Sequence, residues 1–211
     1  MIVKMLTVAP IGTNCYIVGC ESTKECIIID PGGEPDKILR TIEEQQLTLK
    51  FMINTHAHFD HIGAASAIQE QKQVPFLLHK EESVYLDPEV FSQTLASFGF
   101  TDVSPPKVDE YIEADKIYSF GGHQFKVLVT PGHSPGGVCF LFENEVFVGD
   151  TLFAGSIGRT DFPGGSMETL MNSIKTQLMP LDDKIIVYPG HMHPTTIGQE
   201  REFNPFNEYW A

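Results

Sequence analysis

The segment Thr55–His61, with the sequence THAHFDH, places three histidines and one aspartate within six positions. It follows the apolar run Phe51–Ile53 and precedes Gly63, so a buried strand that ends here can aim several side chains at one point. Imidazole nitrogen and carboxylate oxygen are the ligands that borderline divalent metals such as zinc and iron prefer. The spacing therefore predicts a metal site.

Three later apolar runs end in a similar way, on a residue that can bind a metal and that directly follows a glycine. These residues are His133, Asp150 and His191. Glycine at such points lets the backbone approach closely or take a positive φ, which a crowded metal site needs. Four strand ends therefore deliver five histidines and two aspartates.

The number of ligand candidates fits two metal ions. We expect a three-nitrogen site, a mixed site and a bridging carboxylate, formed respectively by His56, His58 and His133, by Asp60, His61 and His191, and by Asp150. Two dications against two carboxylates leave room for a bridging hydroxide. Metal binding lowers the pKa of water from about 15.7 to near 7, which gives a nucleophile at neutral pH.

The second metal can hold a carbonyl oxygen and stabilise the developing oxyanion. Asp60 is expected to orient the hydroxide by a hydrogen bond in addition to binding metal. The sequence contains no Gly-x-Ser-x-Gly elbow and no cysteine near one of the placed histidines. The predicted chemistry is therefore hydrolysis of an activated carbonyl, a thioester or a lactone.

Periodicity and turn residues predict the elements that position these residues. The expected strands cover 3–7, 15–18, 26–29, 49–53, 74–78, 116–120, 124–129, 138–142, 145–148 and 185–188, and the expected helical stretches cover 35–46, 62–72, 80–97 and 167–179. Pro105-Pro106 marks a linker between two halves. Two sheets with helices on their outer faces are an economical way to bury such strands. Because the candidate ligands come from both halves, we expect one domain, 1–211.

Composition excludes several classes of protein. The 211 residues carry a net charge of -14, with a sequence pI near 4.8, which disfavours nucleic acid as a partner. No apolar run approaches the 18 or so residues of a membrane span, and the N-terminus resembles no export signal, so we expect a cytoplasmic protein that binds no membrane. In a reducing compartment the four cysteines are expected to be buried free thiols.

The ligand pattern resembles that of the metallo-β-lactamase superfamily, and the resemblance extends from Asn14-Cys15-Tyr16 and Asp30-Pro31-Gly32 to Asn204-Pro205-Phe206. Within it the chain is most similar to the short branch of hydroxyacylglutathione hydrolases, of glyoxalase II type, through Gly158–Phe162 and Thr195–Glu200. This resemblance implies an α/β fold, a four-layer αββα sandwich of two mixed β-sheets flanked by helices. It also implies a dinuclear zinc, iron or manganese site and hydrolysis of a thioester such as S-lactoylglutathione.

Long members of that branch carry a further C-terminal helical region with basic glutathione contacts, and we do not expect those contacts here. Arg159 is then the best cation near the site and could hold a substrate carboxylate bidentately, through two parallel N–H···O bonds. Asp30, which closes an apolar strand, is expected to orient a histidine ligand. We expect two divalent ions per chain, with zinc as the first choice, and a small-molecule thioester as substrate.

Two alternatives remain open. A persulfide dioxygenase, which the chain also resembles through Gly158–Phe162, would use a single iron held by His56, His133 and Asp150. A lactonase would use the same ligands as the thioester hydrolase. A β-lactamase is disfavoured, because no export signal is present and those enzymes do not use the residue at Asp150 as a bridge.

Overall fold

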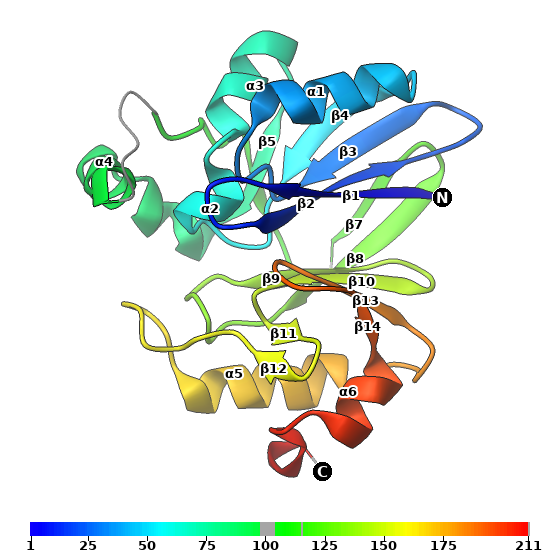
Figure 1. Cartoon of the computed structure of the whole chain (residues 1–211), viewed down its shortest axis with the longest axis vertical. Coiled ribbons are helices and arrows are strands. Elements are labelled where there is room, and N and C mark those ends of the chain that lie inside the picture. Colours follow the sequence, from blue (N-terminus) through cyan, green and yellow to red (C-terminus); the bar gives the residue numbers. More distant parts are fainter. Residues whose placement is uncertain (98–103, 115, 211) are drawn as a thin grey trace. The chain divides into compact units, whose positions relative to one another are not determined.

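The computed structural model describes residues 1–97, 104–114 and 116–210. The chain divides into two compact units, the first formed by 1–112 with 119–124 and the second by 113–118 with 125–211. The first unit contains one mixed six-stranded sheet, and the second contains most of another, each with the helices that cover it (Figure 1). The prediction of one domain, 1–211, stays a prediction.

The first sheet has the strand order β1-β2-β3-β4-β5-β6. The strands are β1 (Ile2–Val8), β2 (Thr13–Gly19), β3 (Glu25–Ile29), β4 (Thr48–Ile53), β5 (Phe76–His79) and β6 (Glu110–Ile112). The first three pair antiparallel, as expected for hairpins, and the last four run parallel to one another. Parallel strands end at the same edge of a sheet, so the loops after β3 and β4 lie side by side.

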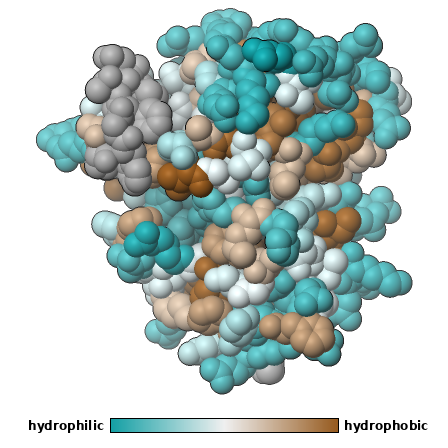
Figure 2. All heavy atoms as spheres, in the orientation of Figure 1, coloured by the Kyte–Doolittle hydropathy of each residue, from teal (hydrophilic) through white to brown (hydrophobic). Residues whose placement is uncertain are grey.

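Helices cover one face of this sheet. They are α1 (Pro35–Glu44), α2 (Phe59–Ile62), α3 (Ala65–Lys72), the 3₁₀ helix η1 (Lys80–Leu86) and α4 (Pro88–Ser97). Ile38 and Ile42 of α1 and Ile68 of α3 pack with the strand residues Ile28 and Met52 in one buried apolar cluster. The opposite face of α1 is charged, and Figure 2 shows hydrophilic residues over this side of the first unit.

The second sheet has the order β14-β13-β10-β9-β8-β7. The strands are β7 (Ile117–Phe120), β8 (His123–Val129), β9 (Val138–Leu141), β10 (Glu145–Gly149), β13 (Ile186–Pro189) and β14 (Thr195–Thr196). Strands β10 and β13 are parallel, whereas β8 with β9, β9 with β10 and β13 with β14 are antiparallel. A separate small hairpin is formed by β11 (Leu152–Phe153) and β12 (Ser156–Ile157).

Helix α5 (Met167–Ser173), which continues as the π-helical turn η2 (Ile174–Leu178), covers one face of this sheet together with α6 (Ile197–Phe203) and the 3₁₀ turn η3 (Asn207–Tyr209) (Figure 1). Leu170, Ile174 and Ile197 pack with Val146 and Val187 of the strands. Trp210, the only tryptophan of the chain, is buried in the same cluster.

The main predicted elements are confirmed, and the differences concern short elements. The helix expected over 62–72 is observed as α3, which begins at Ala65, because the chain between Ile62 and Ala65 turns to bring Ala64 N to Pro31 O at 2.9 Å. The strands β6, β11, β12 and β14 and the helices α2 and α6 were not predicted, and all have seven residues or fewer. All four cysteines are buried and none of them forms a disulfide, as expected. Among the helices of the described ranges, none has the length and apolarity that crossing a membrane requires.

Candidate metal centre

The histidine-rich segment begins directly after β4, at the edge of the first sheet where β3 also ends. Ile29 pairs with Ile53 in the parallel ladder, and Asp30 N donates to Ile53 O at 3.3 Å. This register places Asp30 beside the start of the loop that carries the ligand candidates. The side chain of Asn54 then ties the loop together, because its Nδ2 donates to the carbonyl oxygens of His56 and His61.

Asp30 contacts Thr55 and His61, and its predicted role in orienting a histidine ligand stays a prediction. Its Oδ1 accepts from Thr55 N at 2.7 Å, and its Oδ2 accepts from Thr55 Oγ1 at 2.6 Å and lies 3.0 Å from His61 Nδ1. Since a carboxylate only accepts, Nδ1 of neutral His61 carries the proton and its Nε2 carries the lone pair. Thr55 Oγ1, whose proton goes to Asp30, lies 3.1 Å from His56 Nδ1 and can accept from it. Both histidines are thereby set to bind a metal through Nε2.

Asp60 lies at the start of α2 and is almost completely buried. Thr13, at the first position of β2, donates its hydroxyl to Asp60 Oδ2 at 2.6 Å. The same oxygen lies 3.4 Å from His61 Nε2. Two ligands of one tetrahedral ion, each about 2.0–2.1 Å from it, lie about 3.3 Å apart, so this pair has the spacing of two ligands on a common metal.

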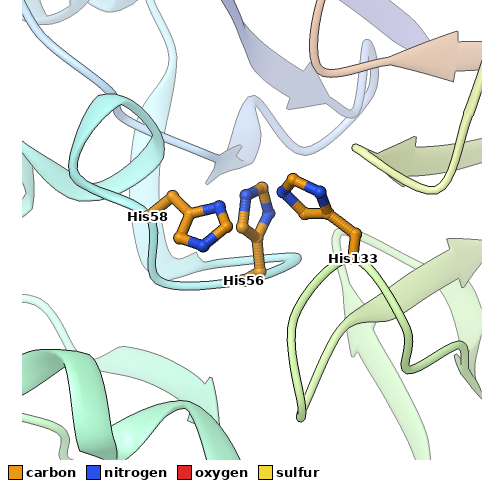
Figure 3. A group of neighbouring side chains, drawn as sticks. All are labelled: His56, His58 and His133. Carbon is orange, nitrogen blue, oxygen red and sulfur yellow. The ribbon is translucent and has the colours of Figure 1, made fainter. Parts of the chain in front are cut away.

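His56 and His58 project from the same loop (Figure 3). The backbone of His58 is extended, with φ -64° and ψ 147°, and alternate residues of an extended segment point to one side. Their ring centroids lie 4.7 Å apart, and those of His56 and His61 lie 4.1 Å apart. The first unit therefore brings together the four ligand candidates of the opening motif.

The remaining ligand candidates belong to the second unit, and parallel pairing brings two of them together. Strands β10 and β13 end side by side, and Gly190 N donates to Gly149 O at 2.8 Å. Asp150 and His191 follow these glycines directly, and His191 Nε2 lies 3.6 Å from Asp150 Oδ2. This distance again fits two ligands of one ion better than a hydrogen bond.

His133, on the loop after β8 (Figure 3), completes this group. Its Nδ1 lies 2.7 Å from the carbonyl oxygen of Arg159, and since a carbonyl only accepts, neutral His133 carries its proton there. Its Nε2 then carries the lone pair and lies 3.6 Å from Asp150 Oδ2. The donor sets of both units thus fit a divalent cation: neutral imidazoles with Nε2 lone pairs beside carboxylate oxygens.

Glycines make room for this arrangement. Gly132 and Gly149 take positive φ, at 132° and 50°, as the sequence analysis expected for glycines before ligands. A Cβ on Gly158 would lie 1.7 Å from the carbonyl oxygen of Asp150 and 3.2 Å from His133 Nδ1. Position 158 must therefore be glycine for the loop after β12 to pass between these two residues.

The side chain of Arg159, predicted to bind substrate, is engaged with a neighbour. Its Nε and Nη2 donate to the two carboxylate oxygens of Asp161, each at 2.7 Å, and its guanidinium lies 3.8 Å from the ring centroid of Phe162. The bonds from Arg159 lower the pKa of Asp161 to about 2. The pair is largely exposed. Substrate binding by Arg159 stays a prediction, and the backbone of Arg159 has a definite role in orienting His133.

The sequence analysis missed three polar residues that hold the ligands: Thr13, Thr55 and Glu82. A hydroxyl adjacent to the first histidine was a possible signal for Thr55. Thr13 and Glu82 are distant in sequence from the residues that they contact, and no local pattern marks them. His193 is exposed, and its Nδ1 lies 3.1 Å from Pro194 O.

Comparison with known proteins relates the chain to a family. The family model described as the metallo-beta-lactamase superfamily matches residues 8–191. A relative from Haemophilus influenzae, "Hydroxyacylglutathione hydrolase GloC", is 39% identical over 209 residues, which cover 98% of each chain.

Solved structures agree with this match. The structure titled "BLEG-1 B3 metallo-beta-lactamase" superposes with a TM-score of 0.90 at 39% identity, over 98% of this chain and 99% of that one. The structure titled "TTHA1623 in a di-iron-bound form" gives 0.86 at 36% identity, over 97% and 100% of the two chains. The predicted fold class, two mixed sheets flanked by helices in an αββα sandwich, is confirmed by these matches. The chain belongs to the metallo-β-lactamase superfamily.

Proposed function

We propose that the protein is a metal-dependent hydrolase that cleaves the thioester of a small thiol, of the S-lactoylglutathione type. Membership of the superfamily supports metal-dependent hydrolysis, and the similarity to GloC favours a hydroxyacylglutathione substrate. The observation that carries the proposal is the spacing of the donor atoms. Three imidazole Nε2 atoms lie 3.4–3.6 Å from a carboxylate oxygen, in His61 with Asp60 and in His133 and His191 with Asp150.

We further propose that seven residues bind two divalent ions, with zinc as the first choice and iron or manganese as alternatives: His56, His58, Asp60, His61, His133, Asp150 and His191. The relative titled as di-iron-bound supports a site for two ions. When bound, the ions would supply a hydroxide at neutral pH and polarise the carbonyl of the substrate.

The residues of the chain have separate tasks in this reaction. Asp30 and the carbonyl of Arg159 hold the protons of His61 and His133 on Nδ1, so that each Nε2 would coordinate an ion when one is bound. Asp60, held by Thr13, directs a carboxylate at the attacking water and orients it for attack on the carbonyl carbon. Water adds to that carbon, the C–S bond breaks, and the products are a carboxylic acid and a thiol. Arg159 is proposed to bind a carboxylate of the substrate by exchanging Asp161 for it.

Metal analysis combined with thioester assays tests the proposal. The purified protein, loaded with zinc and dialysed, is expected to hold two ions per chain and to hydrolyse S-lactoylglutathione. His58→Ala and Asp60→Asn are expected to reduce the rate by at least a hundredfold while the far-UV circular dichroism spectrum stays unchanged. Full activity of either variant in metal-replete buffer would refute the dinuclear mechanism, and His79→Ala, at a histidine outside the site, serves as the control.

The same experiment separates the alternatives. The similarity to BLEG-1 favours including a β-lactam in the substrate panel, since that protein is as similar in sequence as GloC. A lactone tests the lactonase. A single iron per chain, with oxygen uptake on glutathione persulfide, would instead indicate a dioxygenase with His56, His133 and Asp150 as ligands.

We also propose that the two units act as a single catalytic domain, because four of the proposed ligands lie in the first unit and three in the second. The proposed location of the protein is the cytoplasm. The substrate is proposed to be a small molecule, with neither nucleic acid nor membrane as a partner, in keeping with the net charge of -14.

A further inference from the structure

Ala57 lies between the two histidines of the His-x-His segment, and its backbone N–H is buried. The loop has left strand β4 at Ile53, so the sheet ladder no longer supplies an acceptor for it. A buried N–H group without an acceptor costs free energy comparable to a lost hydrogen bond. The position of this N–H is therefore a constraint on how the loop can fold.

Glu82, in the 3₁₀ helix η1, supplies the acceptor. Its side chain is completely buried, and its Oε2 accepts from Ala57 N at 2.7 Å across 25 positions of sequence. A completely buried glutamate is rare among glutamates, because burial of a carboxylate is unfavourable unless hydrogen bonds compensate it. The distance of 2.7 Å is at the short end of the range for an N–H···O hydrogen bond.

A second residue of the same helix contacts the segment. The ring of Tyr85 meets the ring of His58 edge-on, with centroids 5.1 Å apart. In a 3₁₀ helix the side chains at positions i and i+3 lie on one face, so Glu82 and Tyr85 both face the loop. Burial, with a smaller effect of Glu82, raises the pKa of Tyr85 to about 12, so its hydroxyl stays protonated at neutral pH.

We propose that Glu82 is a positioning residue that sets the His56-Ala57-His58 turn in the geometry required for metal binding. The helix η1 holds the turn at two points, the backbone at Ala57 and the imidazole of His58. The length of the Glu82 side chain sets the distance between helix η1 and the turn, and the charge of its carboxylate is secondary. The inference rests on the proposed function, since it assigns a role toward the metal that His56 and His58 are proposed to bind.

Two substitutions separate reach from charge. Glu82→Gln keeps the length of the side chain and an oxygen that can accept from Ala57 N, but removes the charge. Glu82→Asp keeps the charge but withdraws the carboxylate by about 1.5 Å. The matched controls are Glu81→Gln and Glu81→Asp, at the exposed neighbour on the same helix.

The experiment measures the zinc affinity of each variant by competition with a chelator, and the ligand-field spectrum of the cobalt(II)-loaded protein. We expect Glu82→Asp to weaken zinc binding by about 10- to 100-fold and to change the cobalt spectrum. Glu82→Gln and both controls are expected to stay within about threefold of the wild type. The melting temperature of each metal-free protein shows whether the variant is folded.

Three results are informative in different ways. If the folded Glu82→Asp protein binds zinc as tightly as the wild type, the positioning role is overturned. The proposed function still stands in that case if the wild type holds two ions. A loss of zinc affinity in Glu82→Gln would also overturn the positioning role. This result is decisive even if Glu82→Asp does not fold. Absence of binding of zinc, iron and manganese by the wild type would instead refute the proposed function itself.

Discussion

Replacing Asp30 with asparagine is expected to weaken metal binding by His61. His61 is a proposed ligand that Asp30 contacts and that the substitution itself leaves in place. The carboxylate accepts from Thr55 N on Oδ1 and from Thr55 Oγ1 on Oδ2, where it also meets His61 Nδ1. Asparagine has one acceptor oxygen. If that oxygen takes the Oδ1 position, its NH₂ group faces His61 Nδ1, which must then accept, so the imidazole proton moves to Nε2 and blocks coordination.

The opposite orientation of the amide places NH₂ against Thr55 N–H, two donors face to face in a buried site. Either way at least one charge-assisted hydrogen bond is lost, which costs about 1.5–3 kcal/mol in the metal-free protein. Loss of a partner that orients a histidine ligand weakens metal binding by about 10- to 100-fold, equal to about 1.4–2.7 kcal/mol.

The assay compares Asp30→Asn with Asp36→Asn, an exposed acid in the first turn of α1. Urea unfolding of the metal-free proteins measures stability, chelator competition measures zinc affinity, and ¹⁵N chemical shifts report which nitrogen of His61 carries the proton. Zinc affinity within twofold of the wild type, with the proton still on Nδ1, would refute the reasoning. The control is expected to change none of the three quantities.

Three further predictions follow from the contacts of single residues. Asp161→Ala releases the guanidinium of Arg159, so KM for a carboxylate-bearing thioester should fall several-fold with kcat unchanged; an unchanged or higher KM would contradict substrate binding by Arg159. Gly158→Ala forces a Cβ against the Asp150 carbonyl, so it should destabilise the fold by about 1–3 kcal/mol and release zinc; wild-type zinc content would count against this role of the glycine. Burial raises the pKa of the Cys26 thiol from 9.0 to about 12, so the folded state binds this proton more tightly than the unfolded state does. The resulting stability is fully present below pH 9 and is lost as the pH rises towards 12. Between pH 7.5 and 10 the wild type should therefore lose about 1.4 kcal/mol more stability than Cys26→Ala, measured by urea unfolding, and equal losses would contradict it.

The fold class and the identity of the ligand candidates could be predicted because both leave local patterns. Apolar runs followed closely by glycine and then by histidine or aspartate mark the strands β8, β10 and β13 and the loops that follow them. Helix α1 was predictable from the spacing of Ile38, Leu39 and Ile42 after Pro35. In these segments local periodicity and burial point to the same structure.

The residues that hold the ligands could not be predicted in the same way. Glu82 contacts the loop from 25 positions away and Thr13 contacts Asp60 from 47 positions away, and neither stands in a recognisable motif. The short strand β6 pairs only through the register of β5, which the sequence does not display. Such contacts depend on the assembled tertiary structure, so periodicity carries no signal for them.

The most direct test of the account is anomalous diffraction from a crystal of the zinc-loaded protein. The account predicts two zinc peaks per chain, about 3.5–4 Å apart. The first should be bound by His56, His58 and His133, the second by Asp60, His61 and His191, and both by Asp150. A single peak, or peaks whose ligands all come from 54–61 or all from 125–191, would contradict it.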